Sequence, residues 1–420
     1  MVDCGLCQGN DSQRAIKDWP VKPADIDFLF LTHAHIDHIG RLPELIDKGF
    51  KGEIICTHPT KDLLSPMLHD AMGFSGRSNR EIDRLNTTIQ ELSWGFEYNE
   101  QFSLKSGISF KLKNAGHILG SCFIRFESQS PAWSITFSGD LGAANTPILP
   151  DPDIPDACDL LILESTYGNR NHESRQQRIK RLGQTLEQAL ADDGKVFIPA
   201  FAMGRTQELI YEMDRLFSDP EYRSMFPTLS PETKIPVFID SPLGLDITKI
   251  YATLSGYWDK ESKSLFRKGD HPIDFDHLYA VKSHPNHEKL MDIPGPAVII
   301  AGSGMCTGGR ILDHLVSGLD EPENDILFVG YQARGTPGRD ILKYSGRHNG
   351  YVQLNGNKVS IKAKVHALSG YSAHADQKGL VDWVDAMSEK PGRIKLVHGD
   401  REARQGLGAI LSDEGYNCSG

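Results

Sequence analysis

Three histidines and one aspartate fall within six residues, in the stretch His33-Ala34-His35-Ile36-Asp37-His38. An apolar, strand-like segment at 26–31 precedes the stretch, and a helix-like segment at 39–47 follows it. The four side chains are therefore expected on a loop at the carboxyl end of a strand. Imidazole and carboxylate are, after thiolate, ligands that suit Zn²⁺. Their spacing lets side chains face two sides of the loop, which favours two adjacent ions over a run of surface histidines.

The same arrangement recurs along the first part of the chain. His117, Asp140 and Glu164 each follow an apolar strand-like segment, and His398 follows another near the end of the chain. Either His117 or His398 alone would be read as a structural histidine. The repeated placement at strand ends instead predicts one shared site.

The middle of the chain, from about 179 to 350, follows a different pattern. Four strand–loop–helix units occur in sequence, and their loops are rich in glycine. Repeated units of this kind predict a parallel, doubly wound sheet that binds ligands beyond the carboxyl ends of its strands. Three of the four loops carry arginine, including Arg205. Glycine, a helix N-terminus and arginine all suit phosphate, and no acidic ribose partner is evident, which favours a nucleic-acid backbone over a dinucleotide cofactor.

Bulk properties limit the remaining classes. The chain has 420 residues, 39% of them hydrophobic, and contains no run of 18 apolar residues, so we expect a globular protein without a membrane span. Seven scattered cysteines and a start without signal-peptide features predict free thiols in a reducing cytoplasm. The net charge of −11 argues against indiscriminate nucleic-acid binding but leaves room for a local basic groove.

Two metal ions about 3.5–4 Å apart can hold a hydroxide and stabilise the attacking and leaving oxygens of a phosphoryl displacement. Seven candidate ligands suffice for two such ions: His33, His35, Asp37, His38, His117, Asp140 and His398. His374 remains outside this set. It could protonate a leaving alkoxide with Glu164 orienting it, or it could cap the helix that is expected to start near Asp376.

These motifs together resemble a known family. His33 to His38, with Asp3, His117 and Asp140, is similar to the signature of the metallo-β-lactamase superfamily. Glu164, His374 and His398 resemble the extra motifs of its β-CASP branch of nucleic-acid nucleases, which includes the cleavage and polyadenylation endonuclease subunit and RNase J. The resemblance implies an αββα sandwich with an inserted β-CASP domain containing the doubly wound, mainly parallel sheet.

The resemblance also implies roles for the site residues. His33, His35 and His117 would bind one zinc ion, Asp37, His38 and His398 would bind the other, and Asp140 would bridge the two. His374 would be the general acid, supported by Glu164. The predicted catalytic residues are thus Asp37, Asp140, Glu164 and His374.

The family's preference at one position favours RNA as the substrate. Members that cut RNA carry histidine at the position of His398, whereas the DNA-repair branch carries an aliphatic residue. The following residues fall in loops expected to contact RNA phosphates: Arg205, Ser303, Thr307, Arg310, Arg334 and Arg339.

The predicted domain limits are 1–178 for the first part of the metallo-β-lactamase domain, 179–350 for the β-CASP insert and 351–420 for the completing segment. Because only Met1 and Val2 precede Asp3, the first strands of the sandwich are expected to be missing.

A zinc-dependent ribonuclease is therefore the leading hypothesis, with two Zn²⁺ per chain and RNA as its partner. The alternatives are a hydrolase of small esters or thioesters, and a non-catalytic RNA-binding paralogue. The sequence leaves open endonucleolytic against exonucleolytic cutting, zinc against manganese, and a monomer against a homodimer.

Overall fold

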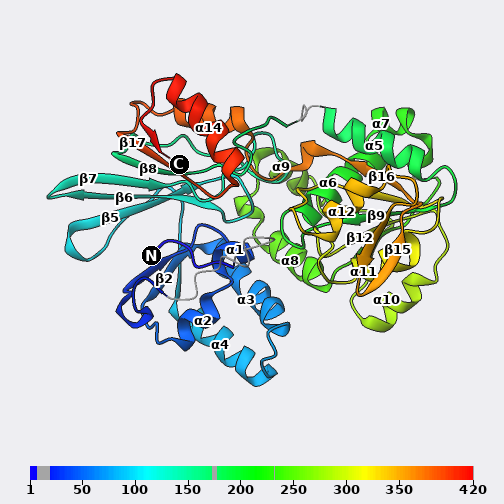
Figure 1. Ribbon diagram of the computed structural model, residues 1–420, viewed down its shortest axis with the longest axis horizontal. Helices are drawn as coiled ribbons and strands as arrows, with labels where there is room; N and C mark the ends of the chain where they lie inside the picture. The colour runs from blue at the N-terminus through cyan, green and yellow to red at the C-terminus, as the bar shows by residue number, and fades with distance from the viewer. Residues whose placement is uncertain (7–18, 173–176, 231, 420) are drawn as a thin grey trace. The chain divides into compact units, whose positions relative to one another are not determined.

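The computed structural model describes residues 1–6, 19–172, 177–230 and 232–419. The chain forms two compact units, Met1–Asn171 with Ala373–Gly420, and His172–Ser372 (Figure 1). It therefore leaves the first unit once and returns to it once. These changes fall at residues 172 and 373, whereas the sequence placed them at 179 and 351.

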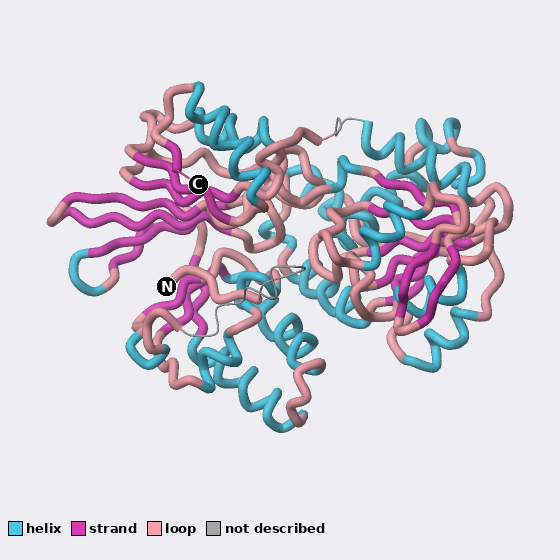
Figure 2. The backbone as a smooth tube through the Cα atoms, viewed as in Figure 1, coloured by secondary structure: helices cyan, strands magenta, loops and turns pink. Residues whose placement is uncertain are grey.

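The first unit contains two β-sheets, visible as separate groups of strands in Figure 2. A three-stranded parallel sheet has the order β1-β2-β3, with strands Phe28–Phe30, Glu53–Thr57 and Ser93–Phe96. A seven-stranded mixed sheet has the order β18-β17-β8-β7-β6-β5-β4. In chain order its strands are β4 Gln101–Ser103, β5 Ile108–Asn114, β6 Cys122–Gln129, β7 Ala132–Phe137, β8 Leu160–Glu164, β17 Arg393–Val397 and β18 Cys418–Ser419.

Helices cover the outer faces of these two sheets. Phe30 and Ile55 of the small sheet pack against Phe110, Leu112 and other residues of the large sheet. These side chains form the core between the two sheets. On its other face the large sheet packs against α13 (Gln377–Asp385) and α14 (Arg401–Asp413). Helices α3 (His58–Gly73) and α4 (Asn79–Leu92) contact the small sheet. The layers are those of the predicted αββα sandwich, which is confirmed.

The N-terminal residues take part in the small sheet. Val2 forms a parallel bridge with Phe30, and the amino group of Met1 donates to the Phe28 carbonyl oxygen at 2.9 Å. Asp3 is thereby fixed beside the end of β1.

The helix predicted over 39–47 is wrong in its extent. The structure has two short helices instead, α1 (Ile36–Ile39) and α2 (Leu42–Asp47), separated by Gly40 and Arg41. Pro43 lies in the first turn of α2, where proline is compatible with a new helix start but not with the interior of a continuous helix.

The second unit is built on a six-stranded sheet of order β11-β10-β12-β9-β13-β16, in which every described pair is parallel. In chain order the strands are β9 Lys195–Pro199, β10 Val237–Asp240, β11 Leu278–Ala280, β12 Ala297–Ala301, β13 Asp325–Phe328 and β16 Lys364–Ala367. The helices of this unit are α5 Arg178–Ala189, α6 Arg205–Ser218, α7 Pro220–Met225, α8 Pro242–Thr253, α9 Lys260–Arg267, α10 His284–Met291, α11 Ile311–Gly318 and α12 Pro337–Tyr344. The expected mainly parallel sheet is confirmed.

The single strand predicted over 358–365 is wrong. Residues Asn357–Ser360 form β15, which pairs antiparallel with β14 (Tyr351–Leu354) through a tight turn. Asn355 and Gly356 at this turn both have positive φ, as a type I′ turn requires. The following residues form β16, which pairs with β13 and so keeps the chain in the second unit as far as residue 372.

In the described part of the chain, no helix combines the length and apolar character needed to span a membrane. Six of the seven cysteines lie in described residues, and all six are free thiols.

Candidate metal centre

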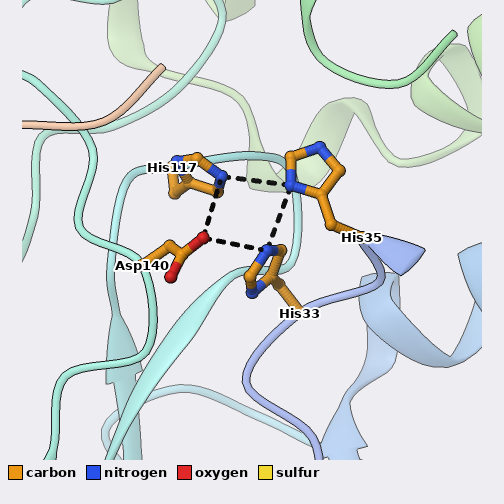
Figure 3. Close-up of side chains that lie close together, drawn as sticks. All are labelled: His33, His35, His117 and Asp140. Atoms are coloured by element: carbon orange, nitrogen blue, oxygen red, sulfur yellow. Dashed lines mark hydrogen bonds and ion pairs between the residues drawn. The ribbon is translucent and has the colours of Figure 1, made fainter. Parts of the chain in front are cut away.

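Four side chains of the first unit converge at the carboxyl ends of its strands (Figure 3). We call His33, His35, His117 and Asp140 the first ligand set. His35 Nδ1 lies 3.1 Å from both His33 Nε2 and His117 Nε2. Asp140 Oδ2 lies 3.6 Å from His33 Nε2 and 3.7 Å from His117 Nε2. Ligands 2.0–2.1 Å from a tetrahedral zinc ion are about 3.3 Å apart, so this spacing fits a metal site.

Strand ends bring these residues together. His33 follows β1, His117 follows β5, and Asp140 follows β7. Cys122 N at the start of β6 donates to the Thr32 carbonyl oxygen at 2.8 Å and thereby ties the two sheets together beside the site.

The three histidines of the first ligand set are held in the neutral form that metal coordination needs. Burial, reinforced by neighbouring imidazoles, holds the pKa of His33 and of His117 well below the usual value. Burial likewise lowers the pKa of His35 to about 4. Burial alone would raise the pKa of Asp140, but the histidines around it, His398 first, hold it well below its ordinary range. Neutral imidazoles beside a carboxylate are the donor set expected of zinc.

The second ligand set comprises Asp37, His38 and His398, whose polar atoms also converge. His398 Nε2 lies 3.6 Å from Asp37 Oδ2. Asp140 faces this set too, because its Oδ2 lies 3.3 Å from His38 Nε2 and its Oδ1 lies 3.5 Å from His398 Nδ1. Asp140 therefore stands between the two sets, where a bridging carboxylate would be.

Charge distinguishes the second set from the first. Against the effect of burial, Asp140 and Asp3 raise the pKa of His38 well above its usual value. Asp140 and Asp37 likewise raise the pKa of His398 to about 9. A cation bound here would therefore replace protons between these carboxylates.

Asp3 and Thr32 contact the Nδ1 atoms of His33 and His38, on the side of each ring away from Asp140. Asp3 Oδ1 accepts from the Thr32 backbone N–H at 2.8 Å. Its Oδ2 accepts from the Thr32 hydroxyl at 2.8 Å and from His38 Nδ1 at 2.7 Å. This bond orients the His38 ring so that Nε2 faces Asp140.

His374 and Glu164 lie beside the first ligand set. His374 Nδ1 is 3.2 Å from Glu164 Oε1 and 3.3 Å from Oε2. The His374 ring centroid is 4.4 Å from that of His117. Burial tends to lower the pKa of His374, but the Glu164 and Asp140 carboxylates outweigh burial and raise it. Helix α13 is capped by Asp376, which accepts from Gly379 N at 2.8 Å, so His374 is not the capping residue.

The arginines predicted to contact RNA phosphates occupy two kinds of environment. Arg205 is buried and paired with Glu208. The Arg310 guanidinium donates to Asp240 Oδ1 at 2.7 Å and to the carbonyl oxygens of Val281 and Lys282. Arg334 and Arg339, by contrast, are exposed. Arg334 lies in the loop before α12, and Arg339 lies in the first turn of that helix.

The two predicted hydroxyl residues belong to one turn after β12. The Ser303 hydroxyl accepts from Thr307 N at 2.9 Å and lies 3.2 Å from the Thr307 hydroxyl. Because β12 ends at Ala301, both residues lie at the carboxyl edge of the parallel sheet.

Sequence reasoning missed a further cluster in the second unit. Asp240, His287 and His314 are all at least 98% buried and come from β10, α10 and α11. Asp240 Oδ2 lies 2.6 Å from His287 Nδ1 and 2.7 Å from His314 Nε2. No local signal marks the cluster, because His287 and His314 come 47 and 74 positions after Asp240 in the sequence.

The αββα sandwich, the histidine–carboxylate centre at its strand ends and the parallel-sheet insert together define a metallo-hydrolase of known architecture. Residues 1–200 match the metallo-beta-lactamase superfamily, residues 206–341 the Beta-Casp domain and residues 358–419 the Zn-dependent metallo-hydrolase RNA specificity domain. The chain belongs to the β-CASP family of the metallo-β-lactamase superfamily.

Characterised relatives agree with this assignment. Ribonuclease TTHA0252 of Thermus thermophilus is 34% identical over 419 residues, which cover 100% of this chain and 92% of the relative. Transcription termination factor FttA of Methanosarcina mazei is 30% identical over 416 residues, covering 96% of this chain. The chain spans only 63% of that factor's length.

A solved structure supports the fold alone. The crystal structure of a protein of unknown function from Enterococcus faecalis V583 superposes with a TM-score of 0.51 at 13% identity. The match covers 93% of this chain and 78% of the other.

Proposed function

We propose that this chain is a metal-dependent ribonuclease that hydrolyses RNA phosphodiester bonds. The observation that carries the proposal is the position of Asp140 between two ligand sets, with His374 and Glu164 beside it. The name of the Thermus relative, a ribonuclease matched over 92% of its length, supports RNA as the substrate.

The two ligand sets would hold two zinc ions. The first ion would be bound by His33, His35 and His117, and the second by Asp37, His38 and His398, with Asp140 shared. The ions would supply an activated water and neutralise charge on the phosphate during displacement. The spacing of the ligand atoms and the neutral state of the first three histidines support this assignment.

His374 is the group of this chain best placed to act as general acid. Its Nδ1 is held by Glu164, so Nε2 is the nitrogen that would give a proton to the leaving oxygen. The Glu164 and Asp140 carboxylates raise the pKa of His374, which favours the protonated ring that a general acid needs. Glu164 itself is fixed, since its Oε1 accepts from Leu141 N at 2.6 Å.

The second unit would contribute phosphate contacts at the carboxyl edge of its sheet. Ser303, Thr307, Arg334 and Arg339 are the exposed or half-exposed candidates. Arg205 and Arg310 would act by shaping the loops, because their guanidinium groups are already paired with carboxylates.

A pair of RNA substrates tests the proposal directly. Two copies of one RNA, labelled at the 5′ or the 3′ end, would be incubated with zinc-loaded wild type and with His374→Ala. Internal fragments with wild type alone identify an endonuclease, whereas immediate mononucleotides from the 5′ end identify an exonuclease. Bound RNA without cleavage, or faster turnover of a chromogenic ester than of RNA, would overturn the proposal in favour of a scaffold or an esterase.

A further inference from the structure

A histidine that binds a metal through one ring nitrogen carries its proton on the other nitrogen. In the first ligand set, Thr32 determines which nitrogen of His33 this is. The Thr32 hydroxyl donates its single proton to Asp3 Oδ2 at 2.8 Å and lies 3.1 Å from His33 Nδ1. Because that proton is committed to a carboxylate, His33 Nδ1 must be the donor in the second contact. Nε2, the nitrogen that faces Asp140, therefore keeps its lone pair.

Thr166 stands in the same relation to His398 in the second ligand set. Its hydroxyl donates to the His398 carbonyl oxygen at 3.3 Å and lies 3.0 Å from His398 Nδ1. A carbonyl oxygen can only accept, so a hydroxyl that donates to it can in turn accept from a ring N–H at Nδ1. Nε2, which lies 3.6 Å from Asp37 Oδ2, is then the nitrogen whose proton a bound metal would replace.

The backbone around these two residues is tightly joined. Ser165 N donates to the His398 carbonyl oxygen at 2.9 Å, and the Ser165 hydroxyl donates to the Val397 carbonyl oxygen at 2.8 Å. His398 has a φ of 49°, which is uncommon for a residue with a side chain. A Cβ on Gly399 would lie 2.6 Å from the Ser165 carbonyl oxygen, so only glycine permits this approach. The hydroxyl and the imidazole are thus held in contact by their main chains.

We propose that Thr166 is the positioning residue of the second metal site, where it fixes the tautomer and the ring orientation of His398. The inference rests on the metal-dependent function proposed above. The tripeptide at the end of β8 then serves two histidines, since Glu164 orients His374 and Thr166 orients His398.

A competing acceptor explains why the hydroxyl is needed. Asp140 Oδ1 lies 3.5 Å from His398 Nδ1, only slightly farther away than Thr166. An imidazole released from Thr166 could turn this N–H toward Asp140. That contact would occupy the bridging carboxylate and move Nε2 out of line with Asp37 and His38.

Thr166→Val keeps the shape of the side chain and removes the hydroxyl, while Thr166→Ser keeps the hydroxyl. Zinc binding to the full chain would be measured by competition with a chromogenic chelator. We expect Thr166→Val to lower the affinity for the second zinc ion about 10–100-fold, as loss of a group hydrogen-bonded to a metal ligand typically does. The affinity for the first ion should stay unchanged. Thr166→Ser should restore wild-type affinity. Thr87→Val, which removes a hydroxyl bonded to a helix carbonyl oxygen in α4, is the matched control.

A second readout is independent of metal affinity and of cleavage. The ¹⁵N chemical shifts of His398 in the zinc-loaded protein should show protonated Nδ1 in wild type and in Thr166→Ser, and a changed pattern in Thr166→Val. Equal second-ion affinity and equal His398 shifts in the valine and serine variants would overturn the inference. A wild-type chain that binds no second zinc ion would instead contradict the proposed function itself.

Discussion

Two histidine–carboxylate clusters, one in each unit, look alike by composition and differ in geometry. In the first ligand set, polar atoms of four residues face one another at 3.1–3.7 Å. In the second unit, Asp240 Oδ2 lies 2.6 Å from His287 Nδ1 and 2.7 Å from His314 Nε2, which are hydrogen-bond distances. The first spacing matches that of ligands around an ion, whereas in the second cluster the carboxylate oxygen is already engaged in hydrogen bonds to both histidines.

The outer contacts of the two clusters differ in the same sense. In the first unit Thr32 and Asp3 engage the outer nitrogens of His33 and His38 and so direct the inner nitrogens toward a common point. In the second unit the carboxylate is already neutralised, because Arg310 donates to Asp240 Oδ1 at 2.7 Å. Burial and residue type are therefore insufficient to identify a metal site. The direction of each ring nitrogen and the charge already paired with the carboxylate are decisive.

Loss of the shared carboxylate should have the largest effect. Asp140→Asn removes the ligand between the two sets, and we expect RNA cleavage to fall by about 10³-fold or more. RNA cleavage by His33→Ala should fall by a comparable factor, and its circular dichroism spectrum should show an intact fold. Undiminished cleavage by both variants in a single-turnover assay would contradict the assignment of the first unit as the catalytic one.

Removal of the general acid should be the next largest effect. His374→Ala should lower the single-turnover cleavage rate by about 10²–10⁴-fold while leaving zinc content unchanged, because His374 lies outside both ligand sets. A variant that loses zinc would show that His374 is a ligand, and an unchanged rate would show that another group gives the proton.

The second cluster should matter for stability. Asp240→Asn removes the charge that pairs with Arg310 and accepts from two buried histidines, so we expect the free energy of unfolding to fall by about 2–3 kcal/mol. Urea unfolding followed by circular dichroism measures this change. Stability equal to that of wild type, or a lost zinc ion, would contradict the structural role of the cluster.

The same variant has a defined pH dependence. Burial would raise the pKa of Asp240, but hydrogen bonds from His314, Arg310 and His287 together lower it below its ordinary value of 3.8. A carboxylate with a lowered pKa stabilises the fold above its unfolded pKa, and this contribution disappears as pH falls through the folded value. The difference between wild type and Asp240→Asn should therefore be full at about pH 7 and shrink below about pH 4. A difference that grows toward acid pH would contradict this assignment.

Exposed arginines of the second unit should give the smallest effects. Arg334→Ala and Arg339→Ala should each weaken RNA binding a few-fold. Each should also reduce the slope of log affinity against log salt by about 0.7, the value for one phosphate contact on a single strand. Filter binding at several salt concentrations measures both quantities, and an unchanged slope would remove the residue from the phosphate-binding surface.

Much of the fold and of the site could be predicted because the signals are local. Apolar strands followed directly by His33, His117, Asp140 or Glu164 predict loops at strand ends. The structure places the first three in the loops after β1, β5 and β7, whereas Glu164 is the last residue of β8 itself. Repeated strand–glycine–helix units likewise predicted the parallel sheet, which is confirmed.

What the sequence could not provide depends on three-dimensional contacts. Thr32 and Thr166 look like ordinary loop threonines, and their importance lies in where one hydroxyl proton points. Asp240 and its histidines meet only after three separate elements pack together. The roles of the ligands, the general acid and the phosphate-contacting arginines stay predictions until variants are tested, as do the limits drawn for the domains.

Zinc content by mass spectrometry of the purified chain tests the central comparison most directly, using Asp140→Asn and Asp240→Asn as a matched pair of buried carboxylate substitutions. The account predicts two zinc ions per chain in wild type and in Asp240→Asn, and fewer in Asp140→Asn. Equal zinc in all three proteins, or a loss confined to Asp240→Asn, would contradict it.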